Sequence, residues 1–297
     1  MILWIFLLFT ASLQATGLYD EELSSDQAYI AIVDAAKEDN WVYVKSQSID
    51  FLREYDEDPS LKDIYFYLGL AHYHHGDFER SNDCLTEYLE TTTAATHFEE
   101  ALLHKFWVAE HFRAGSKKRI FKWQRFPIYL SAYEDALDIY DQVITALPFS
   151  DLCLHSLYGK AKLQTYFEEY KESIQTYQNI TQKFSKDELA VESYIEIAKL
   201  YLHQCKTEHL DPDFLASAEN NYRKFQLAFP GEERLEEAKN LLHEMREAFA
   251  NHLYETGRFY ERTYKPKAAC IYYRKAASQF PNTLAAEKCQ KRLSLLA

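Results

Sequence analysis

The fold is decided by residues 253–281, LYETGRFYERTYKPKAACIYYRKAASQFP, which have the pattern of two helices joined by a short turn. Small and aromatic residues recur at helical spacing on both sides of Lys265 and Pro266, and these two residues interrupt the pattern. Pro281 ends the second helix. The first face carries Leu253, Gly257 and Tyr260, and the second carries Ala269, Tyr273 and Ala276. The stretch therefore predicts one helical hairpin.

The spacing within this hairpin resembles the tetratricopeptide repeat (TPR). That repeat has a large apolar residue at position 4, Gly or Ala at 8, aromatic residues at 11 and 24, Ala at 20 and 27, and Pro at 32. With Gly257 at position 8, all seven positions match. The resemblance implies a hairpin that stacks on similar neighbours, because one repeat cannot bury its apolar face alone.

Similar patterns extend over the rest of the chain. A capping helix at 283–296 follows the last hairpin, and the third and fifth hairpins have long turns. The turn of the third contains a basic insertion at 115–127. The predicted hairpins span 24–59, 62–93, 98–148, 152–185, 189–230 and 232–281. We expect an all-α fold: one domain at 24–297, a superhelical solenoid of about six TPR-like helical hairpins plus the capping helix.

The N-terminal segment, MILWIFLLFTASL at 1–13, is too short for a comfortable membrane span of about 20 residues. It has the length of a secretory signal, and Ala15, Thr16 and Gly17 form a small-x-small cleavage site. We therefore predict a signal peptide at 1–17. An uncleaved anchor and a misassigned start codon are the alternatives. No cysteine follows the apolar run, so the lipobox needed for lipid attachment is missing.

Composition and motifs exclude several classes of function. The formal net charge of −13 opposes nucleic-acid binding, because no excess of Lys and Arg is present to replace phosphate counterions. No catalytic or phosphate-binding motif occurs, so we expect no enzyme activity, no cofactor and no small-molecule substrate. His72, His74 and His75 are better explained by packing and a helix end than by a metal. The five cysteines suit helix packing, with one disulfide left open.

Charge and repeat position identify candidate protein-binding residues. Residues 254–297 have nine Lys or Arg against three Glu, which leaves the rest of the chain at −19. In the second, fourth and sixth hairpins, the first-helix positions that face the groove combine aromatic and charged side chains, which suits an extended peptide. The candidates are Phe66, Tyr73, Tyr158, Lys162, Tyr254, Arg258, Arg262, Lys265 and Lys267. A solvated surface, an acidic partner and an anionic lipid surface remain open for the basic end.

The last seventy residues or so also resemble the BamD (ComL-type) outer-membrane assembly lipoproteins. The residues that carry this resemblance are Phe259, Tyr260, Arg262, Ala268, Ala269, Tyr273, Phe280, Pro281 and Thr283. It implies an envelope protein, in the periplasm or at the inner face of the outer membrane, that scaffolds the insertion of β-barrel proteins. Its C-terminal repeats would contact a barrel insertase, and its N-terminal groove would meet unfolded client chains. Another envelope TPR adaptor, for division, secretion or chaperoning, is the alternative, and peripheral membrane association stays open.

Overall fold

The computed structural model describes residues 24–55, 57–91, 96–119, 128–207 and 210–296. The predicted signal peptide at 1–17 lies outside them. Contacts within the chain divide it into two compact units, Met1–Phe98 (unit 1) and Glu99–Ala297 (unit 2). The expectation of a single domain over 24–297 stays a prediction.

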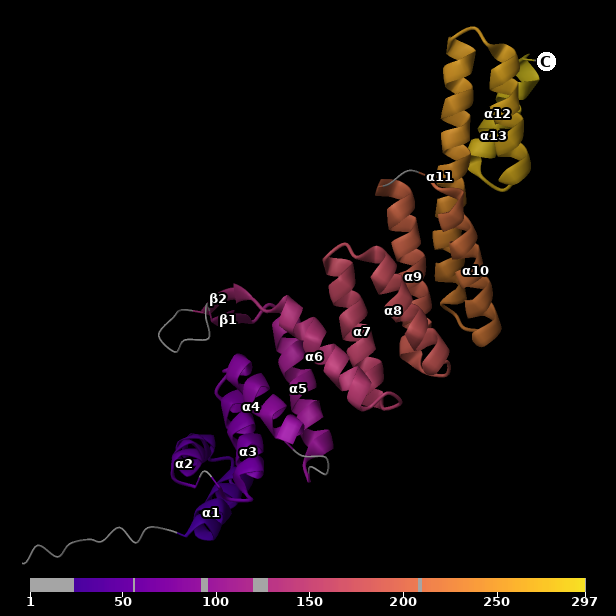
Figure 1. The fold of residues 1–297 in the computed structure, drawn as a ribbon. Coiled ribbons are helices and arrows are strands. Elements are labelled where there is room, and N and C mark those ends of the chain that lie inside the picture. Colours follow the sequence, from indigo (N-terminus) through magenta and orange to yellow (C-terminus); the bar gives the residue numbers. More distant parts are fainter. Residues whose placement is uncertain (1–23, 56, 92–95, 120–127, 208–209, 297) are drawn as a thin grey trace, which may run out of the picture. The chain divides into compact units, whose positions relative to one another are not determined.

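Unit 1 contains two antiparallel helical hairpins (Figure 1). Ser24 caps the first helix. The Ser24 hydroxyl accepts from the Gln27 amide while the Gln27 side chain accepts from the Ser24 amide, a reciprocal cap that satisfies two helix donors. The helices are α1 (Ser25–Lys37), α2 (Trp41–Glu54), α3 (Leu61–His74) and α4 (Phe78–Thr91).

Unit 2 has the same hairpin arrangement, and from its second helix onward successive helices pack on one another. Its first helix starts at the boundary between the units. The helices are α5 (Phe98–Arg113), α6 (Tyr133–Ala146), α7 (Asp151–Tyr166), α8 (Tyr170–Lys183), α9 (Glu188–Thr207), α10 (Pro212–Ala228), α11 (Leu235–Arg262), α12 (Pro266–Gln279) and α13 (Leu284–Leu296). The predicted fold class, an all-α solenoid of TPR-like hairpins with a C-terminal capping helix, is confirmed.

The basic insertion of the third hairpin differs from the expected loop. Strands β1 (Lys117–Arg119) and β2 (Ile128–Ser131) pair antiparallel, with an irregularity between Lys118 and Arg119. Lys118 also forms an ion pair with Asp135 at the start of α6. The described part of the insertion is therefore tied to the helix that follows it. Residues 120–127 lie outside the described part of the chain.

Close helix contacts depend on glycine at three positions. A Cβ added to Gly257 would lie 2.5 Å from Cε1 of Tyr273, a ring that is fully buried in α12. A Cβ at Gly69 would meet Leu85 within the second hairpin. Gly159 makes room for Tyr140 of the preceding hairpin, at 2.7 Å. The first two contacts hold a hairpin together, and the third joins neighbouring hairpins.

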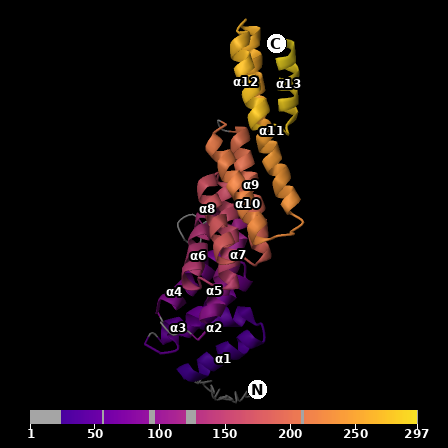
Figure 2. The ribbon, with the colours of Figure 1, turned by 90° about the vertical axis from the view of Figure 1, so that its right-hand side faces the viewer.

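Helix α11 belongs to two packing environments in succession. Leu242, Met245 and Phe249 share a core with α9 and α10, whereas Leu253 and Tyr260 pack with the buried residues of α12 and α13. Figures 1 and 2 show α12 and α13 alongside the second half of α11. This long helix therefore connects the last hairpin to the hairpin before it.

Glu247 of α11 fixes the start of α13. Its two carboxylate oxygens accept hydrogen bonds from the Leu284 and Ala285 amides, at 2.7 and 2.8 Å. The Thr283 hydroxyl accepts from the Ala286 amide at 3.2 Å and so caps the same helix end. A carboxylate at a helix N-terminus satisfies free donors and interacts favourably with the helix dipole.

Substitution of Gly257 by Ala tests the first contact. We expect a loss of about 1–3 kcal/mol in the free energy of unfolding, because the methyl group would press on a buried, rigid ring. Helix propensity alone predicts the opposite sign, a gain of up to about 1 kcal/mol. Chemical denaturation distinguishes the two, and a gain in stability would contradict the packing that the structure shows.

Substitution of Glu247 by Ala tests the attachment of α13. We expect a loss of about 1–2 kcal/mol and faster amide hydrogen exchange at residues 284–286. Glu244→Ala is the matched control, because Glu244 has only the exposed Lys206, at 3.1 Å, as an ion-pair partner among the described residues, and such pairs contribute about 0–1 kcal/mol. Equal effects of the two substitutions would show that the cap does not stabilise α13.

Candidate protein-binding surfaces

The two candidate residues in unit 1, Phe66 and Tyr73, lie on α3 and differ in exposure. Phe66 is only 1 % exposed. Its ring stacks on His97 with centroids 4.4 Å apart and also contacts Tyr88 at 5.4 Å. The groove-facing position of Phe66 is therefore filled from within unit 1. Tyr73 is half-buried, packs edge-on against Phe78, and has a pKa raised by burial.

Unit 2 brings charged side chains from four helices and the residue before α11 into one connected surface, which we call the charged face. Its ion pairs run from Glu110–Arg113 on α5 to pairs that link α9 with the start of α11. The charged face contains four cationic side chains and four carboxylates, so its formal net charge is zero. The residues are Glu110, Arg113, Tyr158, Lys162, Glu192, Glu196, Lys199, Arg234 and Glu237.

Glu110 anchors the α5 end of the charged face. It accepts hydrogen bonds from Arg113 and from the Tyr140 hydroxyl. Burial by itself would raise the pKa of Glu110, but these hydrogen bonds outweigh it and hold the pKa below its usual value. Gly159 makes this arrangement possible, since a Cβ there would collide with the Tyr140 phenol and with Glu110.

At the α9 end, Arg234 connects two helices. It pairs with Glu192 of α9 and with Glu237 of α11, the latter at 3.2 Å. Lys199 adds a second connection, at 2.8 Å to Glu196 and 3.7 Å to Glu237. The charges at this end are therefore compensated within the protein.

Tyr158 and Lys162 of α7 lie between these two ends, as the sequence predicts for neighbouring groove positions. Lys162 Nζ is 4.4 Å from the centre of the Tyr158 ring. Among the described residues, neither Lys162 Nζ nor Tyr158 Oη has a hydrogen-bond or ion-pair partner. Burial, with the charges of Glu192 and Glu196, raises the pKa of Tyr158 to about 12, so its hydroxyl remains a donor. This pair therefore offers two donors on a surface whose other charged residues form ion pairs with one another.

The last hairpin places Tyr254 near two cations. Arg258 donates to Tyr254 Oη at 3.2 Å, and its guanidinium lies 5.8 Å from the ring centre. Lys288 of α13 lies 5.9 Å from the same ring. Glu261, by contrast, is occupied by Arg292 and the Tyr273 hydroxyl. Neither Arg258 nor Lys288 forms an ion pair within the described part of the chain.

The remaining candidates, Arg262, Lys265 and Lys267, are exposed around the turn between α11 and α12. Their side chains have no ion-pair partner among the residues that the structure describes. The structure thus places the nine candidates in three settings: unit 1, the charged face and the end of the last hairpin. Their role in binding stays a prediction.

Most of the charged face was missed from the sequence. The sequence pattern predicts groove positions for the second, fourth and sixth hairpins, and the charged face also uses the third and fifth. Groove positions are 2, 5, 9 and 12 of a repeat that has Gly or Ala at position 8. With Ala109 at position 8, positions 9 and 12 are Glu110 and Arg113. With Ala198 at position 8, positions 2 and 9 are Glu192 and Lys199. Arg234 and Glu237 lie outside the repeat register, so no offset rule would have found them.

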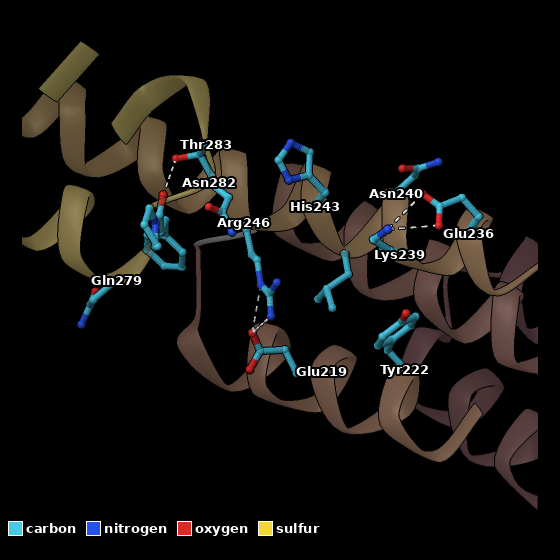
Figure 3. A pocket seen from close by; sticks show the side chains of 13 residues that line it. Glu219, Tyr222, Glu236, Lys239, Asn240, His243, Arg246, Gln279, Asn282 and Thr283 are labelled. Atoms are coloured by element: carbon cyan, nitrogen blue, oxygen red, sulfur yellow. Dashed lines mark hydrogen bonds and ion pairs between the residues drawn. The ribbon is translucent and has the colours of Figure 1, made fainter. Parts of the chain in front are cut away.

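A cavity of about 680 Å³ lies where α10, α11 and the α12–α13 turn meet (Figure 3). Arg246 reaches Glu219 at 2.7 Å, and Lys239 pairs with Glu236 at 3.1 Å (Figure 3). Each cation in the wall therefore has a carboxylate partner. The cavity offers polar groups, including Asn240, but no uncompensated charge.

Other functional classes gain no site in the described ranges. No group of three or more His, Cys, Asp or Glu side chains there could hold a metal ion. His72 is buried, which with nearby Lys45 lowers its pKa to about 4, and His74 stacks on Trp41 at 4.1 Å. None of the five cysteines, all of which lie in the described ranges, forms a disulfide, and three are buried. No described helix has both the length and the apolar character to span a membrane.

Comparison with known proteins gives matches among solved structures only. No family model matches the chain, and no curated protein matches it. A tetratricopeptide repeat protein from Parabacteroides merdae is 14 % identical, with a TM-score of 0.43, over 92 % of this chain and 98 % of its own. A TPR repeats protein from Bacteroides fragilis is 10 % identical, with a TM-score of 0.43, over 92 % and 99 %. A Rap protein complexed with competence and sporulation factor is 13 % identical, with a TM-score of 0.30, over 92 % and 76 %. Scores this low assign neither a family nor a function.

Proposed function

We propose that this protein is a non-catalytic scaffold that binds segments of other proteins. The observation that supports this most directly is the Tyr158–Lys162 pair, which offers two donors within a charged face whose other charged residues form ion pairs. An extended peptide can place a carboxylate on these donors while its backbone and apolar groups lie along the neighbouring helices. The balanced charges around them favour a defined register over general attraction.

A photo-crosslinking residue at His155 tests this function, because His155 is exposed one helical turn before Tyr158. We expect protein adducts in cells, reduced about tenfold or more by Lys162→Glu, since the reversal removes an attraction and adds a repulsion. Lys171→Glu is the matched control, an exposed lysine on α8 without an ion pair in the described structure. Adducts of equal yield in both variants would contradict a role for the pair.

The narrower function we propose is in the cell envelope, in the assembly of outer-membrane β-barrel proteins. It depends on the predicted signal peptide and on the BamD-like pattern of the last hairpin. Within that pattern, Ala269, Tyr273 and Thr283 are buried and build the hairpin, whereas Phe259 and Arg262 are exposed. Only the exposed members could contact a partner directly, and Arg258 lies beside them on α11.

Cross-linked co-purification from the envelope tests this narrower function. We expect a barrel insertase among the partners, and we expect Arg258→Glu with Arg262→Glu to release it. Lys183→Glu with Lys186→Glu is the control, since both lysines are exposed at the end of α8 and lack an ion pair among the described residues. Recovery of other envelope proteins would favour an adaptor for division, secretion or chaperoning. Recovery of cytosolic partners alone would contradict the envelope location.

A further inference from the structure

The turn between α11 and α12 differs from the other hairpin turns at one equivalent position. Five described turns that follow a first helix place a residue in the left-handed region, with φ between 56° and 101°. Such a conformation suits Gly and is tolerated by Asp and Asn, but it is unfavourable for bulky residues. The residues are Asp39, Gly76, Gly115, Glu168 and Tyr264. Only the last of these five turns uses an aromatic residue.

Nothing in the local packing accounts for this tyrosine. Its side chain is 94 % exposed, the most exposed large apolar residue in the described structure. The turn itself is ordered by backbone hydrogen bonds, from Tyr264 N to Glu261 O at 3.1 Å and from Lys265 N to Tyr260 O at 2.9 Å. The chain thus holds a large ring in solvent, on a fixed backbone, in a conformation that glycine would adopt more easily. Unfavourable conformations of this kind concentrate at functional positions.

The charged residues nearest to Tyr264 in the sequence on either side, Arg262 and Lys265, are both positive. Arg262, Lys265 and Lys267 surround it, and the nearest acid, Glu261, is engaged by Arg292 and Tyr273. Helix α12 extends the basic surface. Lys267, Ile271, Arg274 and Lys275 recur at helical spacing on one exposed face, on which Ile271 is 62 % exposed.

The fourth hairpin provides an internal comparison. Its turn also exposes an aromatic ring, Tyr166, which is 65 % exposed. There the next residues of the turn are acidic, Glu168 and Glu169, and Tyr166 packs against Tyr133 at 5.2 Å. An exposed ring alone is therefore not distinctive in this chain. The combination of a protruding ring with unpaired cations is found at the α11–α12 turn.

We propose that this turn binds the surface of a lipid bilayer that contains anionic phospholipids. Exposed aromatic rings and clustered Lys and Arg are the side chains that proteins use at the headgroup level. The cations would interact with lipid phosphates while the Tyr264 ring enters the headgroup region. Because the Tyr264 side chain is 94 % exposed, a protein partner would have to supply a pocket for the ring, whereas a bilayer receives it without one. This membrane contact goes beyond the scaffold function, which concerns the charged face.

Vesicle sedimentation of the full chain tests the proposal. Vesicles of phosphatidylcholine with phosphatidylglycerol are compared with vesicles of phosphatidylcholine alone, at physiological salt. We expect binding to the anionic vesicles, weakened about thirtyfold or more by Lys265→Glu with Lys267→Glu, since each lysine near such a surface contributes roughly a fivefold gain. Lys183→Glu with Lys186→Glu changes the net charge equally and should leave binding nearly unchanged. All variants keep residues 1–23, so any contribution of that segment is common to them.

Tyr264→Gly separates the membrane role from stability. Because glycine relieves the left-handed conformation, we expect the unfolding midpoint to hold or rise by about 2 °C while vesicle binding falls. The proposal would be overturned if vesicle binding were unchanged both in Tyr264→Gly and in the Lys265→Glu, Lys267→Glu variant. Equal losses of vesicle binding in the Lys265→Glu, Lys267→Glu variant and in the Lys183→Glu, Lys186→Glu control would overturn it as well. A different result would be binding of an oligoglutamate peptide that depends on Lys265 and Lys267, with no binding to vesicles. The turn would then be a protein-docking site, and the membrane proposal would be wrong.

Discussion

The last hairpin depends on the contact between Gly257 and the buried ring of Tyr273. Without a side chain at Gly257, α11 approaches α12 closely enough for the ring to fill the space where a Cβ would lie. The same use of a small residue recurs at Gly69 against Leu85, and at Gly159 against Tyr140. Close helix approach therefore sets the geometry both within hairpins and between them, and the exposed side chains take their positions from it.

The surfaces that result differ in charge. On the charged face, carboxylates and cations compensate each other, and only Lys162, beside Tyr158, has no ion pair within the described structure. At the end of the last hairpin, the cations around Tyr264 are unpaired among the described residues. A balanced surface favours one register of a bound chain, whereas an uncompensated basic surface attracts any anionic partner, and more strongly at low salt. This difference is why we propose separate partners for the two.

The sequence predicts the helices well because repeat offsets are local. The match around Gly257 anticipates the packing of Gly257 against Tyr273 within one hairpin. Contacts set by the tertiary structure escape such rules. Phe66 occupies a groove position by count, yet His97, from the connection beyond the next helix, covers its ring. Likewise, the bond between Tyr140 and Glu110 requires Gly159, whose role only the packed helices show.

A double-mutant cycle at Gly257 and Tyr273 tests the central constraint most directly. Gly257→Ala, Tyr273→Leu and the double variant would be compared by chemical denaturation. If the close approach is what Gly257 provides, the smaller Leu side chain makes room for the Ala methyl group. The combined loss of stability should then be smaller than the sum of the single losses by about 1 kcal/mol or more. Losses that add within about 0.5 kcal/mol would contradict the account, because the two positions would then act independently.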